Sequence, residues 1–432
     1  MLPVEGWRNW TGDERCRPAR LTEPASVDDV VAEVRRARGA GQTVRVAGSG
    51  HSFNDAVLTD DVLLALKRMN RVLSMDDDDV RVEAGIPLHV LNAALDDVGL
   101  ALPNLGDIDR QTIAGAIATG THGTGARLFN ISAAVREVEM VTGTGEVVRV
   151  DESSDADGWR AARVNLGALG VVTTVSLRCV PAFNLHGVDR SLPLDDVLAG
   201  LDDLADGNDH FEFYVFPYAR LAYTRTNNRT DDPPRPRSRL RSRVDDIAGN
   251  ELMSMLARTA RRFPEIIPAA NRLAARLWGG SNRIDRSHRV FCSTRRLRFT
   301  ETEYAVPRER AVEAVERVLR TIEARRFDVP LPIEVRFAAG DDAFLSPAHD
   351  RATCHISVHQ FEGMEWRRPF AAVEEVLYEL GGRPHWGKRH SQTHDTLAPL
   401  YPEWSAFQAA RRRFDADGVF ANDYVLRTLG AP

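Results

Sequence analysis

A glycine-rich stretch near the beginning of the chain could bind a phosphorylated ligand. Gly48 and Gly50 follow a short run of alternating valines, and His51 comes directly after them. Glycines permit positive φ angles and close approach of a ligand, and consecutive N–H groups in such a turn can bind a pyrophosphate. The dinucleotide-binding fingerprint needs a third glycine where Phe53 stands, so that fold is not indicated. The stretch therefore predicts a phosphate-binding turn beside a histidine, and the alternative is a tight turn with a solvated histidine.

A second glycine-rich stretch, residues 103–125, could lie against a flat or long cofactor. It contains few large side chains and many glycines and threonines: Gly106, Gly115, Gly120, Gly123 and Gly125, with Thr112, Thr119, Thr121 and Thr124. These residues form poor helix. We therefore expect a loop that lines a cofactor, and the alternative is a close-packed contact between helices.

Polar side chains alternate along two predicted strands late in the chain. In the strand 331–337, Glu334 and Arg336 point to the same face. The strand 353–361 places three polar side chains on one face: His355, Ser357 and His359. Buried polar groups need partners, and a polyol or sugar offers a hydroxyl to each of them. The pattern indicates a site for a polyhydroxylated ligand, and the alternative for Glu334 and Arg336 is a cross-strand ion-pair ladder.

The turn at residues 383–388 is expected to present His385, Trp386 and Lys388 together. A metal hydrolase is the competing interpretation of the late histidines, His355, His359, His385 and His390. Paired metal ligands on a helix need a spacing of four residues, whereas residues 353–361 read as a strand, and no acidic residue has a recognised ligand spacing. No metal site is therefore predicted.

Short elements of both kinds should position these residues. The apolar spacing predicts a helix at 26–41, a strand at 44–47, strands at 62–66 and 79–83, and a helix at 87–98. Residues 135–142 and 146–150 predict a hairpin, and residues 164–178 predict a glycine turn and a strand. After Pro181 the glycine turns become rare and aromatic strands begin, which indicates a domain boundary near residue 182.

Composition limits the class of protein. The hydrophobic fraction of 43%, the charged fraction of 27% and the net charge of −6 are those of a globular protein and give no sign of a nucleic-acid partner. The four cysteines are far apart, the chain start lacks the features of a signal peptide, and no long apolar run occurs. These features predict a cytoplasmic protein without disulfides or transmembrane helices.

Two basic stretches leave alternatives open. Residues 229–243 contain six arginines, which indicate a solvated loop or, alternatively, an anionic partner. Residues 250–278 predict a basic amphipathic helical segment that allows at most weak contact with a membrane surface.

In combination, these motifs resemble one family of flavoproteins. Gly48-Ser-Gly-His-Ser-Phe53, Ala118-Thr-Gly-Thr-His-Gly-Thr-Gly125, Glu334-x-Arg336, His385-Trp-Gly-Lys388 and the closing Asp415-x-x-Gly-x-Phe-x-Asn422 occur in that order. They are similar to the motifs of the sugar-1,4-lactone oxidases (L-gulono-1,4-lactone and D-arabinono-1,4-lactone oxidases) of the vanillyl-alcohol-oxidase superfamily. Alditol oxidases are also similar. The resemblance extends from about residue 10 to residue 430.

The resemblance implies an α+β protein of two domains. Residues 1–181 form an FAD-binding domain, residues 182–400 a cap domain with a large antiparallel sheet that holds the substrate, and residues 401–432 return to the FAD site. It implies that His51 is bonded covalently to the flavin, and a neutral imidazole is a plausible nucleophile near pH 7. The implied FAD-binding residues are Gly48, Ser49, Gly50, His51, Ser52, Gly106, Thr112, Gly115, Thr119, Gly120, Thr121, His122, Gly125, Val171 and Asn422.

The resemblance also implies a reaction, in which a hydride passes from a carbinol carbon to the flavin and oxygen is then reduced to hydrogen peroxide. The implied catalytic residues are Glu334, Arg336, Lys388 and His355, and the implied substrate-binding residues are Asp107, Ser357 and His385. Asp107 favours a lactone over an alditol such as xylitol or sorbitol, because alditol oxidases carry serine there. Gly106 lies in a loop beside the flavin and predicts access for oxygen, although a dehydrogenase with another acceptor remains the alternative.

Overall fold

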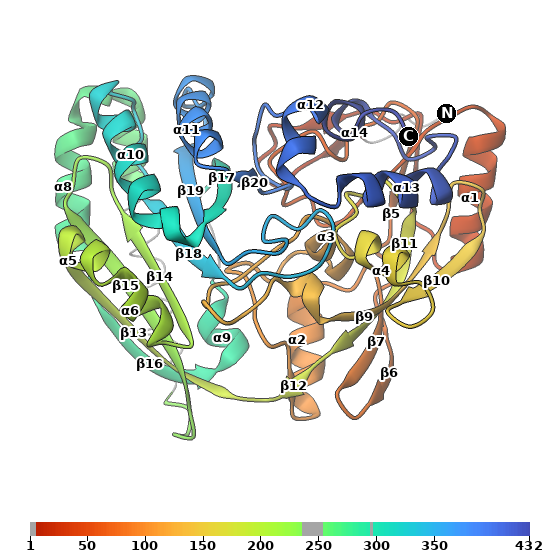
Figure 1. Ribbon diagram of the computed structural model, residues 1–432, viewed down its shortest axis with the longest axis horizontal. Coiled ribbons are helices and arrows are strands. Elements are labelled where there is room, and N and C mark those ends of the chain that lie inside the picture. The colour runs from red at the N-terminus through yellow and green to blue at the C-terminus, as the bar shows by residue number, and fades with distance from the viewer. Residues whose placement is uncertain (1–5, 236–253, 294–296) are drawn as a thin grey trace.

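The computed structural model describes residues 6–235, 254–293 and 297–432. Figure 1 shows two halves side by side, and the half that contains both chain ends also contains α1 and β4 to β11. The other half contains the largest sheet and helices on its outer face. This arrangement agrees with the α+β class and with the large antiparallel sheet expected from the sequence.

The first half is built on two small sheets. Three strands form a parallel sheet in the order β3 (Arg20–Thr22), β5 (Val62–Ala65), β4 (Val44–Ala47). Five strands form an antiparallel sheet in the order β10 (Val147–Asp151), β9 (Val135–Val141), β11 (Val171–Arg178), β7 (Asp79–Glu83), β6 (Val72–Asp76). The predicted strands and the hairpin in this region are confirmed to within a few residues.

Helices of the first half follow their sequence signals. In α1 (Val27–Gly39) the Ser26 hydroxyl accepts a hydrogen bond from the Asp29 N–H, and acidic residues in the first turn suit the positive end of the helix dipole. The helix buries Val30, Val34 and Ala37. The others are α2 (Leu88–Asp97), α3 (Ile113–Ala118) and α4 (Ala156–Ala162). The expectation that residues 103–125 form only a loop was wrong, because α3 forms there with Thr112 as its N-cap.

The C-terminal segment completes the first half. The helices α13 (Trp404–Phe414) and α14 (Asp423–Leu429) bury Phe407, Tyr424 and Leu429 in the same hydrophobic core as α1. The Val44 N–H donates to the Val419 carbonyl over 2.8 Å. The chain therefore returns to the strand that precedes the first glycine turn.

The second half is an antiparallel sheet of eight strands. Its order is β16 (Ser281–Arg286), β13 (Asn184–Pro193), β15 (Leu221–Thr230), β14 (His210–Val215), β18 (Ile333–Ala338), β19 (Thr353–Phe361), β17 (Phe299–Pro307), β20 (Arg383–Pro384). Side chains alternate between its two faces. One face carries Phe213, Val335 and Ile356 into a core covered by α5 (Leu194–Ala199), α6 (Leu201–Asp206), α10 (Ala311–Ala324) and α11 (Arg367–Glu379). The other face carries polar side chains.

The remaining elements are short. In the described part of the chain they include β1 (Trp7–Arg8), β2 (Arg15–Cys16), β8 (Leu100–Ala101), β12 (Val180–Pro181), α8 (Ile267–Leu277), α9 (Ser287–Phe291) and α12 (His394–Leu397). Residues 254–262 are also helical, and 3₁₀ helices occur at Ile131–Ala134, Pro264–Ile266, Arg308–Arg310 and Ala398–Leu400. All four cysteines are free, as expected. Within the described ranges, none of the helices has both the length and the apolar composition that a membrane crossing needs. Most of the arginine-rich stretch 229–243 lies outside the described residues.

Candidate active site

Two cavities adjoin, and only the smaller one lies between the halves of the molecule. The larger, here called the glycine-lined cavity, has a volume of about 380 Å³ and is lined by residues of 45–57, 84–87, 111–119 and 165–172. The smaller, here called the charged cavity, has a volume of about 80 Å³ and is lined by residues of both halves. His51, Ser52, Gln111 and Thr119 line both cavities. A long ligand in the first cavity can therefore present one end to a small ligand in the second.

The glycine-lined cavity owes its shape to missing side chains. A Cβ atom on Gly48 would lie 2.6 Å from the Thr112 hydroxyl, and one on Gly115 would lie 3.1 Å from the same oxygen. Gly50 has a φ of +72°, a conformation that favours glycine, and its carbonyl accepts the Trp10 N–H over 2.7 Å. The turn after β4 is thus a backbone surface that approaches the N-terminal end of α3 closely, as a pyrophosphate-binding turn requires.

His51 lies where the two cavities meet. It comes directly after the Gly48–Gly50 turn, and its ring packs at a tilt against Trp10 with centroids 5.8 Å apart. Burial, with the nearby positive charges of Lys388 and Arg110, lowers the pKa of His51 to about 4. The imidazole is therefore neutral near pH 7 and keeps a nucleophilic nitrogen at the junction.

Arg336 is surrounded by carboxylates in the charged cavity. Its Nη2 forms ion pairs with Asp107, at 2.5 Å, and with Glu334, and its Nε donates to Glu212 over 2.8 Å. The Tyr214 hydroxyl donates to Glu334 over 2.6 Å. Burial opposes the charge of Arg336, but Asp107, Glu334 and Glu212 overcome this effect and raise its pKa well above the usual value. Arg336 is thus a fixed cation in a polar wall.

Lys388 is the second cation of the charged cavity. Its Nζ lies 2.6 Å from a carboxylate oxygen of Glu301 and 3.9 Å from one of Glu303, and it lies over the Phe53 ring at 5.0 Å. Burial would lower the pKa of Lys388, but the carboxylates of Glu301 and Glu303 raise it above the usual value. The amine is therefore charged over the physiological pH range.

A third cluster joins the two halves through Glu303. His122, from residues 103–125, contacts Glu303 through Nε2 at 2.6 Å and the Gly123 carbonyl through Nδ1 at 2.8 Å. Burial would raise the pKa of Glu303, but His122 holds it well below the usual value. Both ring nitrogens of His122 therefore face acceptor groups, a backbone carbonyl on one side and the Glu303 carboxylate on the other.

Glu303 also has partners on its own sheet. Ser357 donates to it over 2.8 Å, and the Nδ1 atom of His355 lies 3.3 Å away. The ring of His355 stacks on that of His122 with centroids 3.6 Å apart. Burial, with the neighbouring His122, lowers the pKa of His355 to about 4. His355 and Ser357 thus support Glu303 from behind the cavity wall, and neither lines the charged cavity.

His385 keeps a defined tautomer at the cavity wall. Its Nδ1 accepts the Gly387 N–H over 3.0 Å, so the proton of the neutral ring is on Nε2. Burial lowers the pKa of His385 to about 3. Trp386 differs from the expectation that it is presented with His385 and Lys388, because its indole is fully buried and donates to the Leu345 carbonyl over 2.6 Å.

Most of the predicted site residues line one of the two cavities. Gly48, Ser49, Gly50, His51, Ser52, Thr112, Gly115 and Thr119 line the glycine-lined cavity. Gly106, Asp107, Thr121, His122, Glu334, Arg336, His385 and Lys388 line the charged cavity. The structure thus brings residues from four separate parts of the chain, 48–52, 106–122, 334–336 and 385–388, into one region.

Four predicted cofactor residues lie outside both cavities. Gly120 faces Pro347, and Gly125 forms a bridge to Ala338 of β18. Val171 is fully buried in β11, and its neighbour Val172 lines the glycine-lined cavity instead. Asn422 donates to three carbonyls of the segment that follows the first glycine turn, those of Asp55, Ala56 and Leu58. Asn422 therefore holds that segment and lies behind the cavity wall.

Sequence reasoning missed five residues of this region: Glu212, Tyr214, Glu301, Glu303 and Gln111. The signal was present, because Glu301 and Glu303 alternate on β17, and Glu212 and Tyr214 alternate on β14. Alternating charged residues inside a strand that is otherwise buried indicate a functional face, as Glu334 and Arg336 did.

The described residues do not bring the late histidines together as a metal centre. Three groups of His, Asp and Glu side chains have ligand atoms within 4.8 Å of one another: His122 with Glu303 and His355, Glu301 with Glu334 and His359, and Asp107 with Glu212 and Glu334. None of these groups contains two of the four histidines considered as ligands. Instead, His390 contacts the Tyr424 hydroxyl at 3.1 Å.

Comparison with known proteins agrees with this description. Residues 18–151 match the family described as "FAD binding domain". The solved structure of a solvent-stable cholesterol oxidase superposes with a TM-score of 0.83, covers 97% of this chain and 96% of its own, and is 18% identical in sequence. At that identity the likeness shows the fold alone. The fold and the FAD-binding family match are those of a two-domain flavoprotein.

The family follows from closer relatives. Residues 175–428 match the family described as "D-arabinono-1,4-lactone oxidase". The chain is 46% identical over 432 residues to the L-gulono-1,4-lactone dehydrogenase of Mycobacterium tuberculosis, with full coverage of both chains. It is 33% identical to the L-gulonolactone oxidase of Bos taurus, with 98% of each chain covered. This chain belongs to the D-arabinono-1,4-lactone oxidase family.

Proposed function

We propose that this protein oxidises a sugar-1,4-lactone of the L-gulono-1,4-lactone type with FAD as its cofactor. The observation that carries the proposal is the charged cavity, a small polar space that adjoins the glycine-lined cavity. The names of the relatives from Mycobacterium tuberculosis and Bos taurus support the same substrate class. In this proposal residues 1–181 and 401–432 serve the cofactor, and residues 182–400 serve the substrate.

The walls of the charged cavity suit a polyhydroxylated molecule better than a steroid. Glu301, Glu334, Arg336 and Lys388 all line a volume of about 80 Å³. An apolar ligand would remove water from these groups without offering hydrogen bonds, which costs free energy for each of them. A lactone with several hydroxyl groups can replace that water with its own donors and acceptors. The structural likeness to cholesterol oxidases therefore does not indicate a steroid substrate for this protein.

FAD fits the glycine-lined cavity, because the missing side chains of Gly48 and Gly115 leave backbone exposed beside Thr112. When bound, the flavin supplies a hydride acceptor. Arg336 and Lys388 stabilise the negative charge that develops on the substrate oxygen as its proton leaves. The carboxylates of Glu301 and Glu334 border the cavity beside these cations and can receive hydrogen bonds from the other hydroxyl groups.

The decisive test is reduction of the flavin without oxygen. The holoenzyme is mixed anaerobically with L-gulono-1,4-lactone, and the flavin absorbance is followed. We expect rapid bleaching with this lactone or a close stereoisomer and slow or no bleaching with xylitol and sorbitol. Bleaching by an alditol but by no lactone would contradict the proposal and assign the cavity to an open-chain polyol.

A covalent bond between His51 and the flavin is the second part of the proposal. It is supported by a neutral imidazole at the junction of the two cavities. We expect the flavin to stay with the acid-precipitated protein, and we expect His51→Ala to release it into the supernatant. His89, whose ring contacts the Asp109 carbonyl at 3.3 Å outside both cavities, offers a matched control as His89→Ala. Release of all flavin from the unmodified protein would disprove the bond.

The electron acceptor is the third part. We propose oxygen, on the basis of Gly106 at the charged cavity, with a dehydrogenase as the second candidate. The name of the relative from Mycobacterium tuberculosis favours the dehydrogenase. Gly106 does not have a positive φ, and a Cβ atom there would lie 3.1 Å from the His122 carbonyl. A larger residue at position 106 would therefore press on the His122 backbone as well as restrict the access of oxygen.

The acceptor is decided by mixing reduced enzyme with air-saturated buffer or with a one-electron acceptor such as ferricytochrome c. We expect hydrogen peroxide in equal amount to oxidised lactone if oxygen is the acceptor. Slow reoxidation in air with rapid reoxidation by the protein acceptor would instead assign a dehydrogenase.

A further inference from the structure

A row of polar residues crosses six neighbouring strands of the large sheet and reaches the charged cavity at Arg336. Cross-strand pairing places Ser281 opposite Asp189, Asp189 opposite Arg225, and Arg225 opposite Glu212. The same pairing places Glu212 opposite Arg336, and Arg336 opposite His355. Residues that face each other directly across antiparallel strands are in contact range. We call Asp189, Arg225 and Glu212 the charge row.

Each member of the charge row is bonded to the next. The Ser281 hydroxyl donates to Asp189 over 2.6 Å, and Arg225 Nε donates to the other oxygen of Asp189 over 2.9 Å. Arg225 Nη1 donates to Glu212 over 3.0 Å, and Arg336 Nε donates to the second oxygen of Glu212 over 2.8 Å. Negative and positive charges thus alternate from the edge of the sheet to Arg336.

Glu212 determines which part of the Arg336 guanidinium faces which partner. It takes the Nε hydrogen, while Nη2 is taken by Asp107 and Glu334. Among the described residues, the Arg336 side chain donates its hydrogen bond through Nε, and the shortest distances of its three ion pairs run from Nε and Nη2, not from Nη1. Because the guanidinium is planar, a partner at Nε together with partners at Nη2 fixes the direction of Nη1. This leaves Nη1 as the nitrogen that can meet a substrate oxygen.

Burial makes the charge row rigid. The side chains of Glu212 and Asp189 are 5% and 7% exposed. Burial opposes the charge of Arg225, but Glu212, the neighbouring Tyr214 and Asp189 overcome this effect and raise its pKa well above the usual value. Water cannot easily take the place of Glu212, so the loss of this partner would leave the charge of Arg336 buried at a high cost in free energy.

We propose that Glu212, supported by Arg225 and Asp189, is a positioning residue that fixes the plane of the Arg336 guanidinium for the reaction. The inference rests on the proposed lactone oxidation and adds residues that lie outside the charged cavity. A purely structural ion-pair ladder is the alternative, and it would affect folding stability without a specific effect on the substrate.

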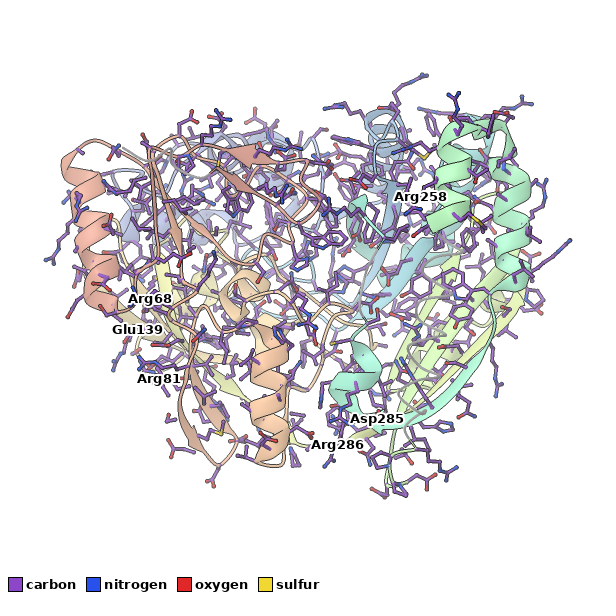
Figure 2. All side chains as sticks on the ribbon, turned by 180° about the vertical axis from the view of Figure 1, so that it is seen from behind. Arg68, Arg81, Glu139, Arg258, Asp285 and Arg286 are labelled. Carbon is purple, nitrogen blue, oxygen red and sulfur yellow. The ribbon has the colours of Figure 1, made fainter. Side chains whose placement is uncertain are left out.

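The test uses Glu212→Gln, Arg225→Lys and a matched control, Glu139→Gln. Glu139 on β9 is also a buried carboxylate between arginines, since Arg81 and Arg149 donate to it over 3.1 and 2.8 Å. Figure 2 shows Arg81 and Glu139 in the first half of the molecule, away from Asp285 and Arg286 of the large sheet. All variants are compared as FAD-loaded protein.

For Glu212→Gln we expect kcat/KM for the lactone to fall by about tenfold to a hundredfold, mainly in kcat, because a small misplacement of a reacting group has effects of this order. Arg225→Lys should cause a smaller loss, and Glu139→Gln should leave kcat/KM near that of the unmodified enzyme at a similar loss of thermal stability. Equal losses in Glu212→Gln and Glu139→Gln, or a change in Glu212→Gln of less than about threefold, would overturn the proposal.

A crystal structure of Glu212→Gln gives a readout that does not depend on activity. We expect the Arg336 guanidinium to rotate away from residue 212 and to pair more fully with Asp107 and Glu334. An unchanged orientation of the Arg336 guanidinium would overturn the positioning role of Glu212 even if the lactone were oxidised. If the unmodified enzyme oxidised no lactone, the proposed function would fail, whereas the rotation would still decide the inference.

Discussion

At the scale of single residues, Lys388 is the site residue whose role can be tested most clearly by substitution. It is one of two lysines in a chain whose other basic residues are arginines. Glu301 holds its amine at 2.6 Å, and its place on the cavity wall leaves a compact cation facing the substrate space. An arginine in the same place would put a wide, planar group into a cavity of about 80 Å³.

We predict that Lys388→Met lowers the rate of flavin reduction by lactone by about 10²- to 10³-fold, because removal of one group that stabilises a developing oxyanion has effects of that size. Lys388→Arg keeps the charge and should recover only part of the loss. The measurement is anaerobic stopped-flow reduction at saturating lactone. Reduction of the Lys388→Met enzyme at the rate of the unmodified enzyme would show that Arg336 alone carries the charge.

The sequence could indicate much of this site at the residue scale. The glycine turn with His51, the alternation of Glu334 and Arg336, and the turn with Lys388 all depend on local pattern, and the structure places each of these residues at a cavity. The burial of Trp386 could not be foreseen, because it depends on Leu345, a residue 41 positions away that accepts its N–H. Local pattern fixes which side chains alternate, but distant partners decide which of them are covered.

At the scale of elements, strand β17 carries more of the site than its sequence suggested. It pairs with β19 along its whole length and places Glu301 beside His359 and Glu303 beside Ser357. Its charged residues alternate with Thr302 and Tyr304, so the pattern was visible, but the partners were not. Pairing between strands that are separated by many residues is the information that a single sequence does not contain.

We predict that Glu303→Gln weakens the contact between β17 and the glycine-rich segment 103–125. The change removes the carboxylate that His122 contacts at 2.6 Å, and loss of one partner of a buried ionic contact lowers the free energy of unfolding by about 3 kcal/mol. Flavin affinity should fall as well, because residues 112–119 of the same segment line the glycine-lined cavity. Urea unfolding and flavin titration in the His51→Ala background measure the two effects.

Glu374 provides the control for this experiment. It is buried on α11 and accepts hydrogen bonds from neutral donors, those of Tyr304, Ser391 and Gln392. Glu374→Gln should lower stability without changing flavin affinity. Equal flavin affinity in Glu303→Gln and Glu374→Gln would mean that the Glu303–His122 contact does not hold the cofactor segment.

At the scale of the whole molecule, the two halves depend on each other. The core of the first half includes Phe344, Leu345 and Trp386 from segments that follow strands of the large sheet. Gly125 contributes its N–H to the Phe337 carbonyl of β18 over 2.8 Å. Unfolding of either half should therefore expose part of the other. The sequence indicated the domain boundary near residue 182, where glycine turns become rare and aromatic strands begin. The packing of residues 343–345 into the core of the first half could not be derived from local patterns.

Buried histidines in both halves link this cooperative stability to pH. Burial is the first cause that lowers the pKa of seven histidines. The pKa falls to about 4 for His51, His210 and His355 and to about 3 for His385 and His390, and it is also lowered for His288 and His349. An unfolded chain protonates histidine near pH 6.5. Between pH 6.5 and 4 the unfolded state therefore binds more protons than the folded state, and stability is lost as the pH falls through that range.

The free energy of unfolding should decrease by up to about 1.4 kcal/mol per pH unit for each of these histidines in that range. Asp341 acts in the opposite direction, because burial raises its pKa to about 6 and stabilises the folded state as the pH falls toward 4. The histidines with a lowered pKa outnumber the carboxyl groups with a raised pKa, which also include Asp328 and Asp415, so the net slope should keep the sign that the histidines give it. Urea unfolding at pH 7.5, 6.5, 5.5 and 4.5 measures it. His390→Gln, whose side-chain amide can still donate a hydrogen bond to the Tyr424 hydroxyl oxygen, should reduce the slope by about one proton. An unchanged slope would show that His390 does not remain neutral in the folded protein.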